Sequence, residues 1–422
     1  MSTWLEEIET PCAIIDVRAL DRNMNTLVSE LEKIEKNRGY HVKVRPHFKA
    51  HKCPEIALRQ LQIGGSYSLG VTAQKVNEVE ALVAAGVGDI LLSNEVVCTK
   101  KLRRLAALAA GRIITDYNKY TPKGLDHYLQ APEPLTGSRV ISLVTDDLEA
   151  TSEASAAAVA EGVILNVLVE IDVGQNRCGV SLIEEAVILA KHVSSLPGLS
   201  LQGIQAYHGS SQHIRSETER SAVVSQVTIA AAETRDSFYA NGLCCNVISG
   251  GGTGTFLCDI SSGVFNEVQC GSFALGDVDY AKNNGGLPIE PALFLATSVM
   301  SVRSNSWIVV DSGLKCQSVD SGPPAYLCLA NEFLENGCLP EGRAEAAAKG
   351  IASLIVTGVG DEHTILKHID VSKSSFPLPS RKQVLLLQPG HCDPFMNHYS
   401  SCYVIDGTRL IGVWTVNRNP GL

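Results

Sequence analysis

The chain has 422 residues, of which 45% are hydrophobic and 19% are charged. This is about three times a typical domain of roughly 150 residues, so the length predicts two domains or a large barrel with an appendage. The composition is that of a folded protein rather than a disordered one. A net charge of −10 with scattered basic residues disfavours a nucleic-acid-binding surface.

The N-terminus and the cysteines both favour a cytoplasmic protein. The first nine residues are acidic, whereas an export signal has a basic start and an apolar run. No apolar stretch reaches the roughly 18 to 20 residues of a membrane-spanning helix. The thirteen cysteines are an odd number without a CxxC pair, which favours reduced thiols. We therefore expect a cytoplasmic location, with no nucleic-acid or membrane partner.

Residues 12–288 alternate short apolar runs with longer amphipathic stretches, which is typical of repeated βα units. The predicted strands are 12–17, 41–48, 67–71, 89–93, 112–116, 139–144, 165–173, 203–208, 245–249 and 267–271. The predicted helices are 74–85, 95–110, 148–161, 182–194 and 216–241. About eight repeats match a (β/α)8 TIM-type barrel, whose active site lies at the carboxyl ends of its strands.

Residues 289–422 have apolar runs without comparable helices between them. The predicted strands are 296–302, 306–311, 352–359, 383–387, 402–405 and 410–416, and a short helix or surface excursion is predicted at 341–349. We assign this region, together with residues 1–11, to a mainly antiparallel β domain. The predicted fold class is therefore α/β, a TIM-type barrel followed by a β domain.

The segment RPHFKAHK at 45–52 ends an early predicted strand. Lys49 within it is a candidate for holding an aldehyde cofactor through a Schiff base. A lysine with that role sits on a rigid element beside groups that lower its pKa, and the basic and histidine neighbours in this segment suit that purpose. A solvated basic strand end explains this segment alone equally well.

Two glycine-containing segments also follow predicted strands. In SGGGTGT at 249–255, consecutive glycines would let backbone N–H groups approach a phosphate, and late barrel loops are common phosphate sites. A glycine-rich turn without a ligand is the alternative. In DVGQNRCGV at 172–180, Arg177 could face a ring nitrogen or an anion, and a surface ion pair is the alternative.

The segment PGHCDP at 389–394 follows another predicted strand. On extended backbone, residues two apart point the same way, so His391 and Asp393 could grip one divalent ion while Cys392 faces the other side. This nitrogen and oxygen ligand set suits Mn, Mg, Fe or Zn. A His–Asp pair that merely caps a turn is an equal contender.

In combination, these segments resemble the D-threonine aldolase family. These are fold-type III enzymes that use pyridoxal 5′-phosphate (PLP) and share the architecture of alanine racemase. The likeness extends from Thr10-Pro11 to the PGHCDP segment. Related D-serine and D-3-hydroxyaspartate dehydratases carry a cysteine as second metal ligand, two residues after the histidine. Asp393 at that position favours the aldolase branch.

The resemblance implies a role for each motif. The residues near the cofactor would be Lys49 at its aldehyde, Arg177 at its pyridine nitrogen, Tyr207 and Gln212 close by, and Gly251, Gly252 and Thr253 at its phosphate. His391 and Asp393 would hold a divalent metal, namely Mn, Mg or Zn. The predicted catalytic residues are thus Lys49, His391 and Asp393.

The activity implied is retro-aldol cleavage of a D-β-hydroxy-α-amino acid of the D-threonine type to glycine and an aldehyde. PLP would act as the electron sink, and the metal would ease deprotonation of the β-hydroxyl. His208, His363 and a metal-bound water are the candidate bases. A homodimer acting on a small-molecule amino acid is also implied. A PLP- and metal-dependent dehydratase, a racemase or another lyase on this fold, a non-catalytic PLP-binding protein and a metal-only hydrolase are the alternatives.

Overall fold

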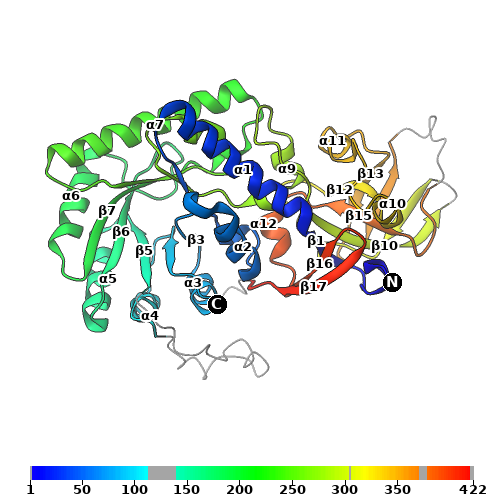
Figure 1. Cartoon of the computed structure of the whole chain (residues 1–422), viewed down its shortest axis with the longest axis horizontal. Coiled ribbons are helices and arrows are strands. Elements are labelled where there is room, and N and C mark those ends of the chain that lie inside the picture. Colours follow the sequence, from blue (N-terminus) through cyan, green and yellow to red (C-terminus); the bar gives the residue numbers. More distant parts are fainter. Residues whose placement is uncertain (1, 113–138, 304–305, 370–377, 419–422) are drawn as a thin grey trace.

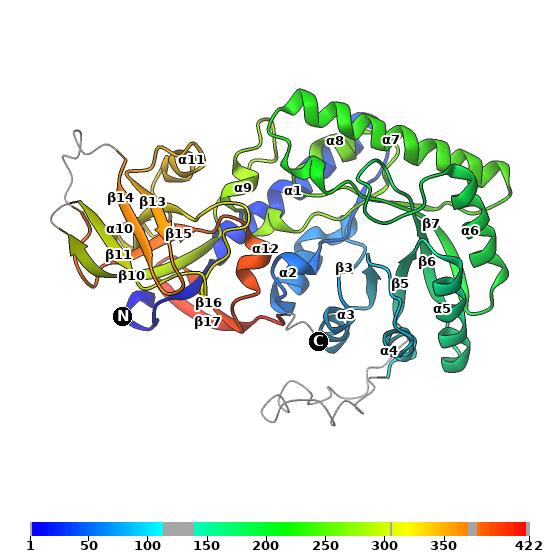
Figure 2. The ribbon, with the colours of Figure 1, turned by 180° about the vertical axis from the view of Figure 1, so that it is seen from behind.

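The structure, a computed structural model, describes residues 2–112, 139–303, 306–369 and 378–418. It consists of a parallel sheet surrounded by helices and a second sheet beside it (Figure 1). The view from behind shows helices α9 (Val278–Ala281) and α12 (Cys392–Met396) where the two parts meet (Figure 2). Within the described ranges, no helix combines the length and apolarity needed to cross a membrane.

The first sheet has eight parallel strands among the described residues. They are β2 (Lys43–Val44), β3 (Val71–Ala73), β4 (Asp89–Leu92), β5 (Val140–Thr145), β6 (Leu165–Glu170), β7 (Leu199–Ala206), β8 (Val247–Gly250) and β9 (Glu267–Val268). Their order is β2-β9-β8-β7-β6-β5-β4-β3. Parallel bridges from Val44 to Ser68 and from His47 to Thr72 connect the two ends of this order. The predicted fold class, a TIM-type barrel followed by a β domain, is confirmed.

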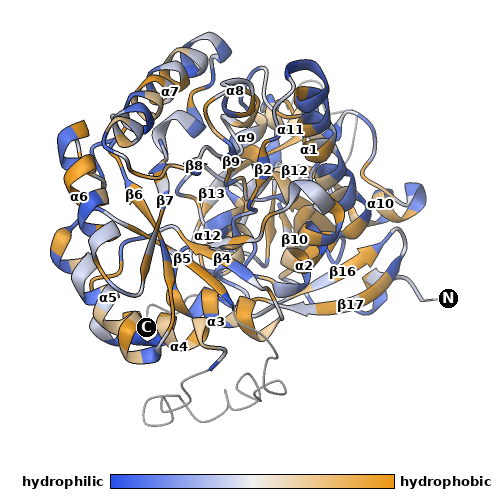
Figure 3. Cartoon of the chain, turned by 60° about the vertical axis from the view of Figure 1, so that its left-hand side comes forward, coloured by the Kyte–Doolittle hydropathy of each residue, from blue (hydrophilic) through white to orange (hydrophobic). Residues whose placement is uncertain are grey.

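Helices cover the outside of the parallel sheet. They are α1 (Val17–Arg38), α2 (Pro54–Gly64), α3 (Val76–Ala84), α4 (Thr99–Ala109), α5 (Leu148–Glu161), α6 (Ile183–Ser195), α7 (Glu217–Ala240) and α8 (Phe256–Ser261). Their apolar faces pack on strands that are rich in hydrophobic residues (Figure 3), and some apolar side chains, such as Val159, Ile188 and Ile229, are exposed on the helices. The predicted helix at 148–161 has the observed bounds because Asp147 caps its first turn and Gly162 ends it at φ +67°.

The second sheet contains nine strands within the described part of the chain. They are β1 (Cys12–Asp16), β10 (Leu293–Arg303), β11 (Trp307–Val310), β12 (Ala325–Leu329), β13 (Leu354–Val359), β14 (Thr364–His368), β15 (Val384–Gln388), β16 (Ser401–Asp406) and β17 (Arg409–Thr415). The order is β13-β14-β11-β10-β1-β16-β17, with β15 paired to β10 and β12. Short helices α10 (Ala330–Asn336) and α11 (Arg343–Ala348) accompany it. All of its pairings are antiparallel except that of β1 with β16.

Strand β1 was expected to begin the barrel, and this placement is wrong. It pairs antiparallel with β10 and parallel with β16, at the centre of the second sheet. All five of its residues are buried, so the apolar run could not indicate to which sheet it belongs. The proposed division into 12–288 and 289–422 with 1–11 stays a prediction about folding units.

Strands β4 and β5 are consecutive among the described strands of the parallel sheet. These two strands pair directly, from Asp89 with Val140 to Leu92 with Leu143. Apart from Arg112, the strand predicted at 112–116 lies outside the described residues.

Candidate active site

The predicted cofactor-binding residues follow strands that are neighbours in the barrel. Lys49 follows β2, Arg177 follows β6, Tyr207 follows β7, and the glycine segment begins at the end of β8. The order β2-β9-β8-β7-β6 places all of these carboxyl ends on one side of the barrel mouth. The structure therefore brings together residues that are separated by more than 200 positions in the chain.

Lys49 lies on a short 3-10 turn, Phe48–Ala50, and faces Tyr207. Its Nζ is 5.8 Å from the centre of the Tyr207 ring, and the Arg177 Cζ is 5.6 Å from the same ring centre. Burial alone lowers the pKa of Lys49, but the Tyr207 phenol and the Asp393 carboxylate raise it above the usual lysine value. The Arg177 charge acts to lower it, but the net shift is upward, so the expectation of a lowered pKa is wrong.

The loop that carries Arg177 is shaped by one carboxylate. Asp172 Oδ1 accepts hydrogen bonds of 3.0 Å from the backbone N–H groups of residues 174, 175 and 176. The Arg177 side chain is 51% exposed and approaches Glu170 at 3.9 Å. The guanidinium is therefore directed towards the barrel mouth by Glu170 and Tyr207 and is otherwise available to a ligand.

The glycine loop after β8 is compact enough to require its glycines. Gly251 has φ +66°, and a Cβ there would lie 2.2 Å from Asp259 Oδ2. A Cβ on Gly252 would lie 2.6 Å from Gln212 Oε1. Thr253 Oγ1 accepts a hydrogen bond of 3.1 Å from the Phe273 N–H. The loop is thus buried, and the side chains of Gln212 and Asp259 pack directly against its backbone.

Gln212 supports this loop. Its Oε1 accepts hydrogen bonds from Gly254 N at 3.0 Å and Thr255 N at 3.3 Å, and its Nε2 donates to Thr255 Oγ1 at 2.9 Å. The side chain is 1% exposed. Gln212, expected only to lie near the cofactor, therefore shapes the predicted phosphate loop.

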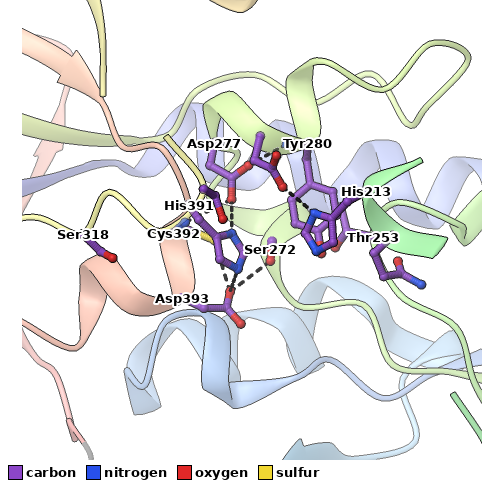
Figure 4. Close-up of polar contacts among 12 residues, drawn as sticks. His213, Thr253, Ser272, Asp277, Tyr280, Ser318, His391, Cys392 and Asp393 are labelled. Carbon is purple, nitrogen blue, oxygen red and sulfur yellow. Dashed lines mark hydrogen bonds and ion pairs between the residues drawn. The ribbon is translucent and has the colours of Figure 1, made fainter. Parts of the chain in front are cut away.

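His391 and Asp393 are close together, but only His391 has the predicted extended backbone, whereas Asp393 is helical. His391 is the residue preceding α12, and Asp393 lies in the first turn of that helix (Figure 4). His391 Nε2 and Asp393 Oδ1 are 3.9 Å apart. Because metal–ligand bonds to nitrogen and oxygen are about 2.0–2.2 Å long, both atoms can share one ion.

The predicted metal ligands His391 and Asp393 are connected to the turn that carries Lys49 and to the barrel. Lys52 Nζ donates to the backbone oxygens of Lys49, at 2.6 Å, and Asp393, at 2.9 Å. Ser272, which follows β9, donates to Asp393 Oδ1 at 3.0 Å. Burial alone raises the pKa of Asp393, but His391, Lys49 and Lys52 hold it well below its usual value. The predicted metal ligands and the predicted cofactor lysine therefore belong to one site.

Two aspartates at the start of α9 were not found from the sequence. Asp277 Oδ2 accepts from His391 Nδ1 at 2.8 Å, and Asp279 Oδ2 is 2.5 Å from His213 Nδ1. Burial alone lowers the pKa of His391, but the Asp277 hydrogen bond and the Asp393 charge raise it to about 9. The spacing of the acids, two residues apart in GDVDY, was the available signal, but it does not identify their partners.

His213 is a third histidine of the site, and the sequence singled out other candidates for the base. Its ring centre is 6.3 Å from that of His391, with Tyr280 beside both rings (Figure 4). His208 Nδ1 accepts from Ser211 N within its own turn, and His363 lies between β13 and β14 of the second sheet. His213 is therefore the better placed candidate for proton transfer beside the predicted metal ligands His391 and Asp393.

Two family models match the chain. Residues 129–279 match the alanine racemase N-terminal domain, and residues 292–405 match a serine dehydratase domain. The first match ends within α9 and the second begins just before β10.

The chain is similar to characterised aldolases over nearly its whole length. It is 34% identical to a D-threonine aldolase from an Arthrobacter species over 415 residues, covering 98% of this chain and 93% of the relative. It is 34% identical to a 3-hydroxy-D-aspartate aldolase from Paracoccus denitrificans over 419 residues, covering 97% and 92%. The crystal structure of a D-threonine aldolase from Filomicrobium marinum superposes with a TM-score of 0.80 at 33% identity, covering 97% of this chain and 95% of that one.

Proposed function

The chain belongs to the D-threonine aldolase family, and we propose that it cleaves D-β-hydroxy-α-amino acids of the D-threonine type to glycine and an aldehyde. The reaction is a retro-aldol that uses PLP and a divalent metal. One observation carries the proposal: Lys49 and the His391–Asp393 pair lie at one barrel mouth, where Lys52 Nζ donates to the backbone oxygens of both Lys49 and Asp393.

The residues at the mouth fit the parts of PLP. Lys49 offers an amine for the aldehyde, Arg177 a cation for the pyridine nitrogen, and the loop of Gly251, Gly252 and Thr253 a backbone surface for the phosphate. That Lys49 and Arg177 both approach the Tyr207 ring supports a flat group bound between them. When bound, PLP supplies the electron sink that stabilises negative charge at the substrate Cα.

His391 and Asp393 fit a divalent metal. A nitrogen and a carboxylate oxygen 3.9 Å apart are ligands that Mn, Mg or Zn accept. A bound ion supplies Lewis acidity towards the substrate β-hydroxyl. Lys52 and Ser272 hold Asp393 in place for that purpose.

We assign the removal of the β-hydroxyl proton to His213. Asp279 at Nδ1 orients the imidazole, which leaves Nε2 to accept the proton. As the proton leaves the hydroxyl, the O–H electron pair forms the aldehyde carbonyl, the Cα–Cβ bond breaks, and the electron pair of that bond stays on Cα. Protonation of Cα then gives glycine. Arg215 also contacts Asp279, so the pair is held at the mouth from two sides.

Dehydration is the competing reaction and places different demands on the site. The hydroxyl would have to leave while a base removes the Cα proton, and the products would be ammonia and a 2-oxo acid. The carboxylate of Asp393, where the dehydratases that this sequence resembles carry a cysteine, favours cleavage to glycine.

Family resemblance also predicts a homodimer, which light scattering of the purified protein tests.

A product assay tests the proposal. The metal-supplemented enzyme should convert D-threonine, but not L-threonine, to glycine and acetaldehyde, and chelation should stop turnover while the visible absorbance of bound PLP remains. Lys49→Ala should lose that absorbance. Ammonia and 2-oxobutanoate as the main products would instead establish the dehydratase.

A further inference from the structure

The His391 imidazole has possible metal ligands on both sides. Asp393 lies on the Nε2 side, at 3.9 Å. On the Nδ1 side, ligand atoms of Asp277, His391 and Cys392 all lie within 4.8 Å of one another. Because a neutral imidazole has one protonated nitrogen and one lone pair, its tautomer decides on which side an ion can bind.

Asp277 is immobilised by the backbone around it. It precedes α9, and its Oδ1 accepts from Tyr280 N at 2.8 Å. Its Oδ2 accepts from Cys392 N at 3.0 Å as well as from His391 Nδ1. Two backbone hydrogen bonds fasten the same segments, from Val278 N to the oxygen of residue 389 at 3.1 Å and from the N–H of residue 279 to the oxygen of residue 390 at 3.0 Å. Both carboxylate oxygens are therefore already used as acceptors.

Cys392 is poorly suited to act as a metal ligand. Its side chain is fully buried, in the apolar core shared with α12. Its Sγ–H donates to Asp393 Oδ1 at 3.4 Å, as a thiol does. The Nδ1 side of His391 thus offers a carboxylate with its hydrogen bonds filled and a protonated sulfur.

We propose that Asp277 is a positioning residue that keeps the proton of His391 on Nδ1 and thereby presents Nε2, beside Asp393, to the divalent metal. The hydrogen bond of 2.8 Å fixes the ring and increases the basicity of Nε2, as carboxylates behind metal-binding histidines do. This inference rests on the proposed metal site. It adds which nitrogen of His391 binds the metal and why that nitrogen binds it tightly.

Binding of Mn²⁺ alone to the purified PLP-loaded protein, followed by electron paramagnetic resonance, tests this role. Asp277→Asn should weaken Mn²⁺ binding about 10- to 100-fold, because an amide cannot replace the carboxylate behind the imidazole. Asp279→Asn is the matched control, since it alters the partner of His213 but not that of His391.

A second measurement does not depend on any variant folding. In the zinc-loaded wild-type protein with ¹⁵N in its histidine rings, nuclear magnetic resonance should find His391 with a protonated Nδ1 and a metal-bound Nε2. A metal-bound Nδ1 would overturn the inference. So would unchanged Mn²⁺ affinity in Asp277→Asn.

The proposed metal site and the positioning role of Asp277 can be refuted independently. If His391→Ala and Asp393→Ala both retain wild-type Mn²⁺ binding, the proposed metal site itself is wrong. If these two variants lose the metal while Asp277→Asn keeps it, the metal site stands and only the positioning role is refuted.

Discussion

Asp259 lies buried beneath the glycine loop, and its protonation should make the stability of the protein depend on pH. The side chain is 2% exposed and accepts a hydrogen bond of 2.6 Å from Thr255 Oγ1. Burial raises its pKa from 3.8 to about 7, although the hydrogen bonds from Thr255 and the Gly252 N–H act in the opposite direction. The perturbation we consider is Asp259→Asn, which keeps the shape and removes the titration.

The sign and size follow from the pKa difference. Because the folded-state pKa is higher, the folded state binds more protons than the unfolded state between about pH 4 and pH 7. Stability from Asp259 is therefore complete below about pH 4 and is lost as the pH rises through about 7. A shift of about 3 units corresponds to about 4 kcal/mol, or about 1.4 kcal/mol per pH unit across that range.

Urea unfolding of the wild type and Asp259→Asn at a series of pH values, at constant PLP concentration, measures this effect. Far-ultraviolet circular dichroism is the appropriate signal, since the tryptophans, at positions 4, 307 and 414, report on the second sheet and its surroundings. The free energy of unfolding of the wild type should fall relative to that of the variant as the pH rises from 5 to 7. A constant difference between the two proteins over this range would refute the reasoning.

Three further changes test other parts of the structure. Gly251→Ala should lower PLP affinity at least tenfold in an absorbance titration, because its φ of +66° and the carboxylate 2.2 Å from the new Cβ force the loop to move. Arg45→Met should destabilise the protein by about 3–5 kcal/mol in urea unfolding, because Asp89 and Glu267 would lose their shared partner inside the barrel. Metal binding at pH 7 should release close to one proton, seen by calorimetry in buffers of different ionisation enthalpy, because the pKa of His391 without metal is about 9.

Local sequence signals predicted the fold well where they acted within one element. The bounds of α5 follow from its cap and its terminal glycine, and the barrel helices α6 and α7 start and end within one residue of their predicted bounds. Helix α1 was not predicted, although its buried Leu20, Met24, Leu27 and Leu31 have the spacing of a helical face. The sheet to which β1 belongs depends on partners almost 300 residues away, and no local pattern contains that information.

In the candidate site, too, contiguous motifs were predicted from the sequence and contacts between distant segments were not. Motif analysis selected Lys49, Arg177, the glycine loop and the ligands His391 and Asp393, because the residues of each motif are contiguous in the sequence. Asp277 was missed because its partner His391 is 114 residues away. The extended backbone predicted for the segment holds at His391 but not at Asp393, because α12 begins at Cys392 instead of the segment continuing β15.

The central position of β1 has a consequence for synthesis on the ribosome. This strand leaves the exit tunnel early, but its antiparallel neighbour β10 follows about 280 residues later and β16 later still. At about 5–20 residues per second, its backbone waits roughly 15 seconds to a minute for the first partner. A fragment ending at residue 288 would never supply one and would leave both edges of an apolar strand open to self-association. We therefore expect the unpaired β1 of a nascent chain to need shielding until β10 is made.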